Sequence, residues 1–130
     1  METTVVCLDT SILIDYYRKK DKRKSAFFQL TNRFKLFSVS IVTEYEIMVG
    51  TKTDQEEFWK KFFDKVTILP FNKSVNDWAV SITKQLKSSN KLIEVPDIFI
   101  AATAKAHNLP LATLNLKHFE RIKDLAIVQI

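Results

Sequence analysis

Short apolar runs alternate with helix-like segments along this 130-residue chain, and the alternation limits its possible folds more than any other feature. Between the runs, apolar residues recur at helical spacing. Strands separated by helices predict parallel βαβ units with helices on both faces of one mostly parallel sheet. We therefore expect a single α/β domain over residues 1–130. The five runs that predict strands are residues 5–8, 34–39, 66–69, 109–113 and 126–130.

The composition excludes several classes of protein. With Gly50 as its only glycine, the chain cannot form the glycine-rich loops that cradle nucleotide phosphates. Gly50 is instead expected to end the helix that Ser40 begins, in the left-handed conformation that glycine favours. The single cysteine, Cys7, lies in an apolar run, which predicts a buried thiol, no internal disulfide and a cytoplasmic protein. No run of about 18 apolar residues predicts a membrane segment.

The formal net charge is +5, and six positive charges gather within residues 18–24. Such a run suits contact with the phosphate backbone of a nucleic acid, but a solvated helix end has the same composition. The run alone does not decide between the two. The candidate RNA-binding residues are Arg18, Lys19, Lys20, Lys22, Arg23 and Lys24.

Four polar residues are placed where an α/β sheet binds ligands. Asp9 follows the first strand, and Asn115 follows the fourth, although each could simply cap a helix. Asp97 comes directly after Pro96, in the first turn of a helix whose small, apolar residues let it approach the sheet closely. Glu44 lies one turn into the helix that Ser40 begins, and taken alone it could be a surface acid.

Taken together, these side chains predict a site for a hard cation. Three carboxylates and an amide make an oxygen-rich set that suits Mg²⁺ or Mn²⁺. His107 and His118 have no cysteine partners and no zinc-like spacing, so we interpret them as ordinary surface or core residues. Carboxylate-held cations beside a basic surface are typical of enzymes that cleave phosphodiester bonds. The residues therefore indicate a nuclease.

Four motifs in this order resemble the PIN-domain ribonucleases and, among them, the VapC-type toxins of prokaryotic toxin–antitoxin pairs. The motifs cover residues 8–11, 40–50, 96–104 and 111–119, and the resemblance spans nearly the whole chain. It implies a three-layer α/β/α sandwich with strand order 3-2-1-4-5. Its implied metal ligands are Asp9, Asp97 and Glu44, with Thr10 or Ser11 steadying the site and Asn115 at a position that is Asp in many relatives. It assigns no role to Glu94.

The same resemblance implies the activity and the partners. We expect a Mg²⁺-dependent endoribonuclease that leaves 5′-phosphate and 3′-hydroxyl ends, as the toxin of a type II toxin–antitoxin system. A cognate antitoxin would occlude the crevice with a basic or aromatic side chain, and the chain would form a homodimer. Phe58, Trp59, Phe62 and Phe63 could serve that dimer or simply pack in the core.

Two other functions are weighed against this one. The amide at Asn115, which removes one negative charge, is the only hint of a catalytically inactive PIN-fold RNA-binding or assembly module. A haloacid-dehalogenase-type phosphatase needs a second Asp two residues after the first, and Ser11 stands there instead.

Overall fold

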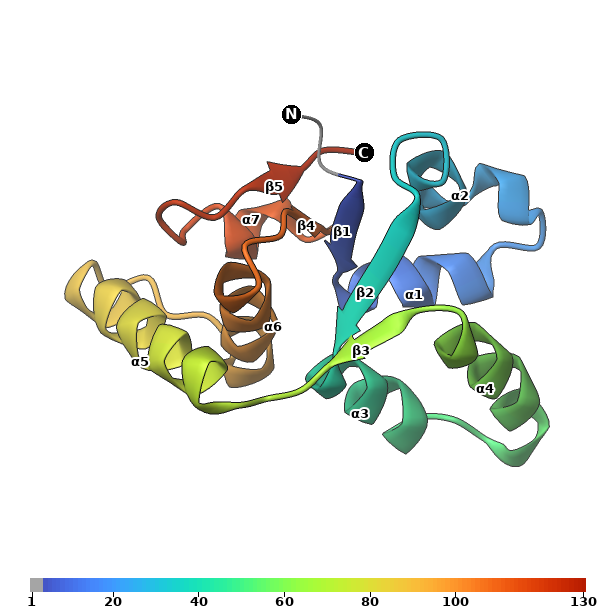
Figure 1. Cartoon of the computed structure of the whole chain (residues 1–130), viewed down its shortest axis with the longest axis horizontal. Helices are drawn as coiled ribbons and strands as arrows, with labels where there is room; N and C mark the ends of the chain where they lie inside the picture. The colour runs from blue at the N-terminus through green and yellow to red at the C-terminus, as the bar shows by residue number, and fades with distance from the viewer. Residues whose placement is uncertain (1–3) are drawn as a thin grey trace.

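A computed structural model describes residues 4–130 and contains one five-stranded sheet (Figure 1). All neighbouring strands pair in parallel, and the strand order is β3-β2-β1-β4-β5, as predicted. The last two strands are shorter at both ends than the runs 109–113 and 126–130 that predicted them. The strands are β1 (Val5–Leu8), β2 (Leu36–Ser40), β3 (Thr67–Leu69), β4 (Leu111–Ala112) and β5 (Ile127–Val128).

Helices cover both faces of the sheet, which confirms the three-layer α/β/α arrangement (Figure 1). Helices α1, α2 and α4 pack on one face, and α5, α6 and α7 pack on the other. None of the helices within residues 4–130 is both long and apolar enough to cross a membrane. The helices are α1 (Thr10–Arg18), η1 (Lys22–Lys24), α2 (Ala26–Leu30), α3 (Ile41–Val49), η2 (Thr53–Gln55), α4 (Glu56–Asp64), α5 (Lys73–Ser88), α6 (Val95–Ala106) and α7 (Leu116–Phe119).

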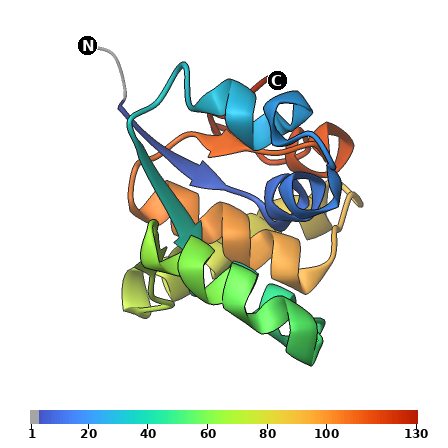
Figure 2. The same cartoon turned by 90° about the vertical axis from the view of Figure 1, so that its right-hand side faces the viewer.

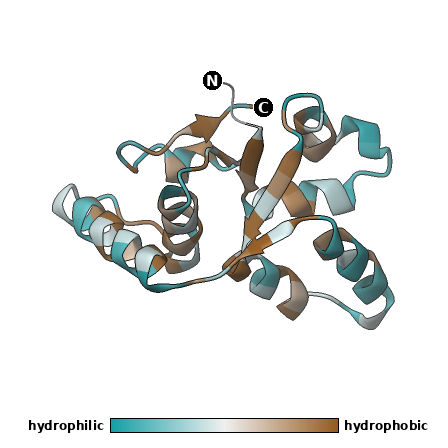
Figure 3. Cartoon of the chain, in the orientation of Figure 1, coloured by the Kyte–Doolittle hydropathy of each residue, from teal (hydrophilic) through white to brown (hydrophobic). Residues whose placement is uncertain are grey.

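The central strand β1 is buried on both faces. Val6 and Leu8 point into the core beneath α1, α2 and α4, whereas Cys7 points into the core beneath α5 and α6, following the two-residue period of a strand. Figure 3 shows this strand in the hydrophobic colour, whereas α4 and α5 carry both hydrophobic and hydrophilic residues. Burial is the main cause that raises the pKa of the Cys7 thiol to about 12, so the thiol is protonated and unreactive at neutral pH.

Helix ends place the polar residues at the carboxyl end of the sheet. Figure 2 shows β1 leading directly into α1, and Asp9 is the N-cap at that junction. Ser40 caps α3 through its hydroxyl, which accepts from Val42 N at 3.0 Å. Gly50 does follow the last residue of α3, but its φ of −88° is right-handed, so the left-handed ending that we predicted is wrong.

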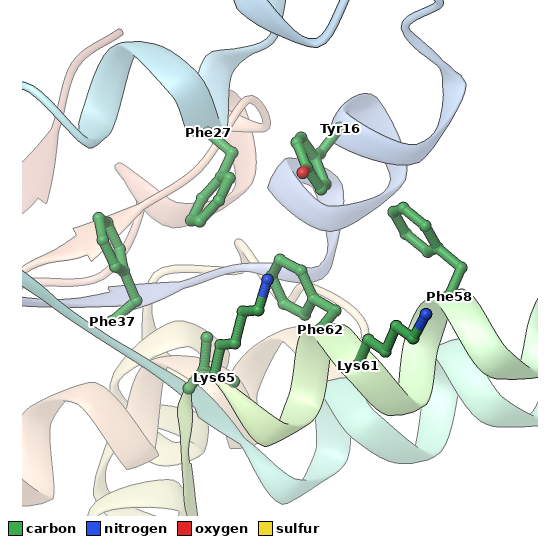
Figure 4. Close-up of a pocket in the computed structure, with 8 residues that line it drawn as sticks. Tyr16, Phe27, Phe37, Phe58, Lys61, Phe62 and Lys65 are labelled. Carbon is green, nitrogen blue, oxygen red and sulfur yellow. The ribbon is translucent and has the colours of Figure 1, made fainter.

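The aromatic residues of α4 pack inward. Trp59, Phe62 and Phe63 are 4%, 8% and 8% exposed, and they contact one another edge to face or tilted. Of the two alternatives, core packing is therefore confirmed for these three residues, whereas Phe58 is half-buried and lines a pocket. A pocket of about 330 Å³ opens at the edge of this cluster, between α1, α2 and α4, with Lys61 and Lys65 among its lining residues (Figure 4).

Candidate active site

Asp9 is held at the centre of the crevice, between the strands that flank β1. Its backbone N–H donates to Ala112 O of β4 at 2.9 Å, and its side chain is 3% exposed. Asp9 Oδ2 accepts from Ser11 Oγ at 2.7 Å and from Thr113 Oγ1 at 2.8 Å, while also capping α1. Asp9 is thus both a helix cap and a crevice residue, and Thr113 is a contact that the sequence did not predict.

Glu46 is the glutamate of α3 that contacts α1 at the same crevice. Thr10 Oγ1 donates to Glu46 Oε1 at 2.7 Å and lies 3.0 Å from Thr43 Oγ1. The short distance to a carboxylate is that of a charge-assisted hydrogen bond. Of the two hydroxyl residues expected to steady the site, Thr10 thus contacts Glu46 and Ser11 contacts Asp9.

Glu44, the glutamate that we predicted as a metal ligand, faces away from this contact. Glu44 and Glu46 lie two residues apart and so about 200° apart around α3, on opposite sides of the buried stripe of Thr43 and Ile47. No hydrogen bond or ion pair joins the Glu44 side chain to another residue in the described part of the chain. The structure brings Glu46, and not Glu44, to Asp9 and Asp97.

Asp97 occupies the first turn of α6 and contacts His118, which is itself in contact with Asn115. Asp97 Oδ2 lies 3.2 Å from His118 Nδ1, which in turn lies 2.8 Å from the Asn115 side-chain amide. The atom that Asn115 presents to Nδ1 is its amide nitrogen, so an unprotonated Nδ1 accepts from Asn115. A protonated Nδ1 donates to Asp97 instead, and the Asn115 amide must then turn its oxygen towards the ring. His118 thus belongs to the crevice and is not the ordinary residue that we interpreted. Asn115 and His118 are three residues apart, which puts them on one face of a helical turn.

The charges of nearby acids act on Asp97 and Glu46, and we call Asp9, Glu46, Glu94 and Asp97 the acid cluster. Burial is the largest cause that raises the pKa of Asp97, and the charges of Asp9 and Glu94 raise it further, against the hydrogen bond and charge of His118. Burial also raises the pKa of Glu46, and the charges of Asp97, Asp9 and Glu94 add to this, against the hydrogen bond from Thr10. Glu94, which had no assigned role, therefore contributes to the negative field of the crevice.

The donor chemistry of the acid cluster fits a hard divalent cation. Asp9, Glu46 and Asp97 each use one carboxylate oxygen for a hydrogen bond within the protein, and the other oxygen has no hydrogen-bond partner among the described residues. Within residues 4–130, no three His, Cys, Asp or Glu side chains stand close enough together to hold a metal ion as they are. Like-charge repulsion keeps ionised carboxylates apart, and a cation between them removes that repulsion.

The cations of residues 18–24 fall into two groups: those that pair within the protein and those that do not. Lys22 Nζ donates to the carbonyl oxygens of Tyr16, Tyr17 and Lys19 at 2.6–2.8 Å, so it caps the C-terminal end of α1. Arg23 pairs with Asp21 through two hydrogen bonds of 3.1 Å.

The prediction that Lys22 binds RNA is therefore wrong, because its ammonium group donates to three backbone carbonyl oxygens of the protein. Lys19 reaches Asp15 at 3.7 Å. The remaining three cations of the run are exposed and form no ion pair with any residue in 4–130; they are Arg18, Lys20 and Lys24.

Comparisons with known proteins agree with this geometry. Residues 6–125 match the family model of the PIN domain. Ribonuclease VapC1 of Methanocaldococcus jannaschii is 33% identical over 135 aligned positions, which cover 97% of this chain and 87% of that protein. Two solved complexes contain similar chains. One is the DNA-bound VapBC of Salmonella typhimurium (TM-score 0.85, 21% identity, 97% and 98% of the chains). The other is a toxin–antitoxin complex of Klebsiella pneumoniae (TM-score 0.78, 27% identity, 95% and 96% of the chains). The chain belongs to the PIN-domain family and, within it, to the VapC group.

Proposed function

We propose that this chain, as a single PIN domain over residues 1–130, is a Mg²⁺- or Mn²⁺-dependent endoribonuclease and the toxin of a type II toxin–antitoxin system in the cytoplasm. The observation that carries the proposal is the acid cluster: Asp9 at the end of β1 has Glu46 of α3 and Asp97 of α6 for neighbours, each carboxylate held by a hydrogen bond through one oxygen. The names of relatives support the same conclusion, since the M. jannaschii protein is a ribonuclease. The reaction class is hydrolysis of an RNA phosphodiester bond.

Each residue of the crevice has a defined task in this proposal. Asp9, Glu46 and Asp97 would hold the cation through their free carboxylate oxygens. When bound, the cation supplies the Lewis acidity that activates water and stabilises charge on the phosphate. Ser11 and Thr113 fix the rotamer of Asp9, and the hydroxyl of Thr10 fixes that of Glu46.

His118 orients Asp97 from the other side, and Asn115 holds the imidazole ring. These fixed contacts lower the cost of assembling the site around the substrate. Cleavage then leaves a 5′-phosphate and a 3′-hydroxyl end.

An antitoxin is the protein partner that we propose. The similar S. typhimurium and K. pneumoniae chains were solved as parts of a VapBC complex and a toxin–antitoxin complex. The aromatic pocket of Figure 4 suits an apolar side chain of such a partner, and an acidic neighbour of that side chain would pair with Lys61 or Lys65. A basic or aromatic side chain of the antitoxin inserted among the carboxylates would close the crevice.

A homodimer through α3 follows from an exposed apolar stripe. Ile41, Tyr45 and Val49 are one turn apart and are 41%, 67% and 67% exposed. A helix stripe of this kind can pack on its own copy about a two-fold axis. We expect Tyr45→Lys to give a monomeric mass in light scattering, where the wild type and the control Phe28→Lys, which charges an exposed aromatic residue of α2, stay dimeric. A wild-type monomer, or a dimeric Tyr45→Lys, contradicts this interface.

Metal removal tests the proposed activity directly. The purified protein is expected to cut RNA in the presence of Mg²⁺ or Mn²⁺, to stop completely in EDTA and to recover when the metal is restored, because only a cation offsets the charge of the acid cluster. Sequencing of new 5′-phosphate ends measures the cutting. Equal cutting in EDTA argues against the metal mechanism, and RNA binding with neither cutting nor Mn²⁺ binding favours the inactive RNA-binding module.

A further inference from the structure

A second pocket adjoins the acid cluster, and no step of the proposed reaction uses most of its residues. It measures about 350 Å³ and lies between α1, α3 and the start of α4. This volume falls at the lower end of the range for small-ligand sites, about 300–1,000 Å³. Glu46 belongs to both the pocket and the acid cluster, so a group bound in the pocket lies beside the reaction site. The lining residues that matter here are Tyr17, Arg18, Glu46, Thr51, Gln55 and Trp59.

Two aromatic rings form one wall of this pocket. The rings of Tyr17 and Trp59 are 5.5 Å apart between centroids and tilted by 31°. Trp59 is 4% exposed, and no hydrogen bond joins its indole N–H to another residue within 4–130, although the N–H of a buried Trp usually finds a partner. Because the core covers Trp59, the half-buried ring of Tyr17 is the aromatic surface that a bound group can reach. Contact between an aromatic ring and an unstacked nucleobase is worth about 1–3 kcal/mol per base.

Polar groups with unused hydrogen-bonding capacity line the rest of the pocket. Gln55 Oε1 accepts from Lys52 N at 3.1 Å, which leaves the Gln55 amide N–H groups without a partner in the described chain. Thr51 Oγ1 donates to Ile47 O at 2.7 Å, so its lone pairs stay available as acceptors. Arg18 is exposed and forms no ion pair with residues 4–130. The pocket thus offers donors, an acceptor and a cation around an aromatic wall.

We propose that this pocket is a base subsite, which receives one unpaired nucleobase next to the scissile phosphodiester and sets the base preference of cleavage. The inference rests on the proposed ribonuclease function. Proteins recognise specific RNA sequences mainly through splayed-out bases, which stack on aromatic rings and form hydrogen bonds through their edges. Gln55 and Thr51 would bind the base edge, and Arg18 would bind the neighbouring phosphate, where its charge offsets the acid cluster. The aromatic pocket of Figure 4, which lacks such amide and hydroxyl groups apart from Tyr16, suits a protein partner better.

The test replaces the Gln55 side-chain amide with an apolar group of nearly the same size. Gln55→Leu removes the unused N–H donors, and Gln29→Leu makes the same change at an exposed site on α2. Wild type and both variants cut a random-sequence single-stranded RNA pool with Mg²⁺, and new 5′-phosphate ends are sequenced. We expect a base preference beside the cut that Gln55→Leu weakens about fivefold to tenfold, as the loss of one hydrogen bond would. Gln29→Leu should keep the wild-type preference.

Several outcomes overturn the subsite. One is a wild type that shows no base preference, and another is a Gln55→Leu variant that keeps the preference in full. A Gln55→Leu that cuts like the wild type but resists neutralisation by the cognate antitoxin assigns the pocket to a protein ligand and also overturns it. In each of these cases metal-dependent cutting that Asp97→Asn abolishes leaves the proposed function standing. Absence of any metal-dependent cutting by the wild type overturns the function itself.

Discussion

Asp97→Asn is expected to lower RNA cleavage about 100-fold or more while the protein stays folded. The loss follows because the variant removes a charged oxygen from the acid cluster, and metal stabilisation of charge is worth several kcal/mol, at about 1.4 kcal/mol per tenfold in rate. Initial cleavage rates with Mg²⁺ measure the effect. A rate within a few fold of the wild type contradicts a role for Asp97 in the site.

Thermal denaturation provides the control for this variant. The folded state raises the pKa of Asp97, mainly through burial, so its ionised form destabilises the fold as pH rises from the unfolded-state pKa through the folded-state pKa. At neutral pH the neutral amide relieves that cost, and the Tm of Asp97→Asn should equal or exceed that of the wild type. A large fall in Tm would instead attribute the lost activity to unfolding. Activity gained at the expense of stability is usual for clustered catalytic acids.

Glu46→Gln and Glu44→Gln form a matched pair with opposite expected results. Glu46→Gln should lower cleavage about 10- to 100-fold, since it removes a charge from the acid cluster and weakens the contact with Thr10. Glu44→Gln should stay within about threefold of the wild type, because no described residue bonds to Glu44. Cleavage rates at saturating Mg²⁺ compare them under one condition. A larger loss in Glu44→Gln than in Glu46→Gln would restore the assignment made from the sequence.

Helical periodicity alone could not predict which of these two glutamates lies at the crevice. Thr43 and Ile47 define the buried stripe of α3, and the two glutamates border it on opposite sides at nearly equal angles. Both are half-buried, so the apolar pattern cannot distinguish them. Only the position of α1, which brings Thr10 to one border, makes the difference.

The sheet was predictable because its signals are local. Each apolar run is short and flanked by helix-like segments, and Asp9 stands directly at the end of the central one. His118 could have been found from its spacing to Asn115. The role of Lys22 could have been anticipated from the preference of helix C-terminal ends for cations, since it lies four residues past the end of α1. Thr113, in contrast, reaches Asp9 only through the pairing of β1 with β4.

The pairing of β1 with β4 also sets when the crevice can form during synthesis. Thr113 and Asp9 are 104 residues apart, so translation at about 5–20 residues per second separates them by roughly 5–20 s. During that interval the central strand lacks the neighbour that completes the crevice, so the proposed nuclease site is incomplete. The strand order therefore delays the proposed activity until most of the chain has been synthesised.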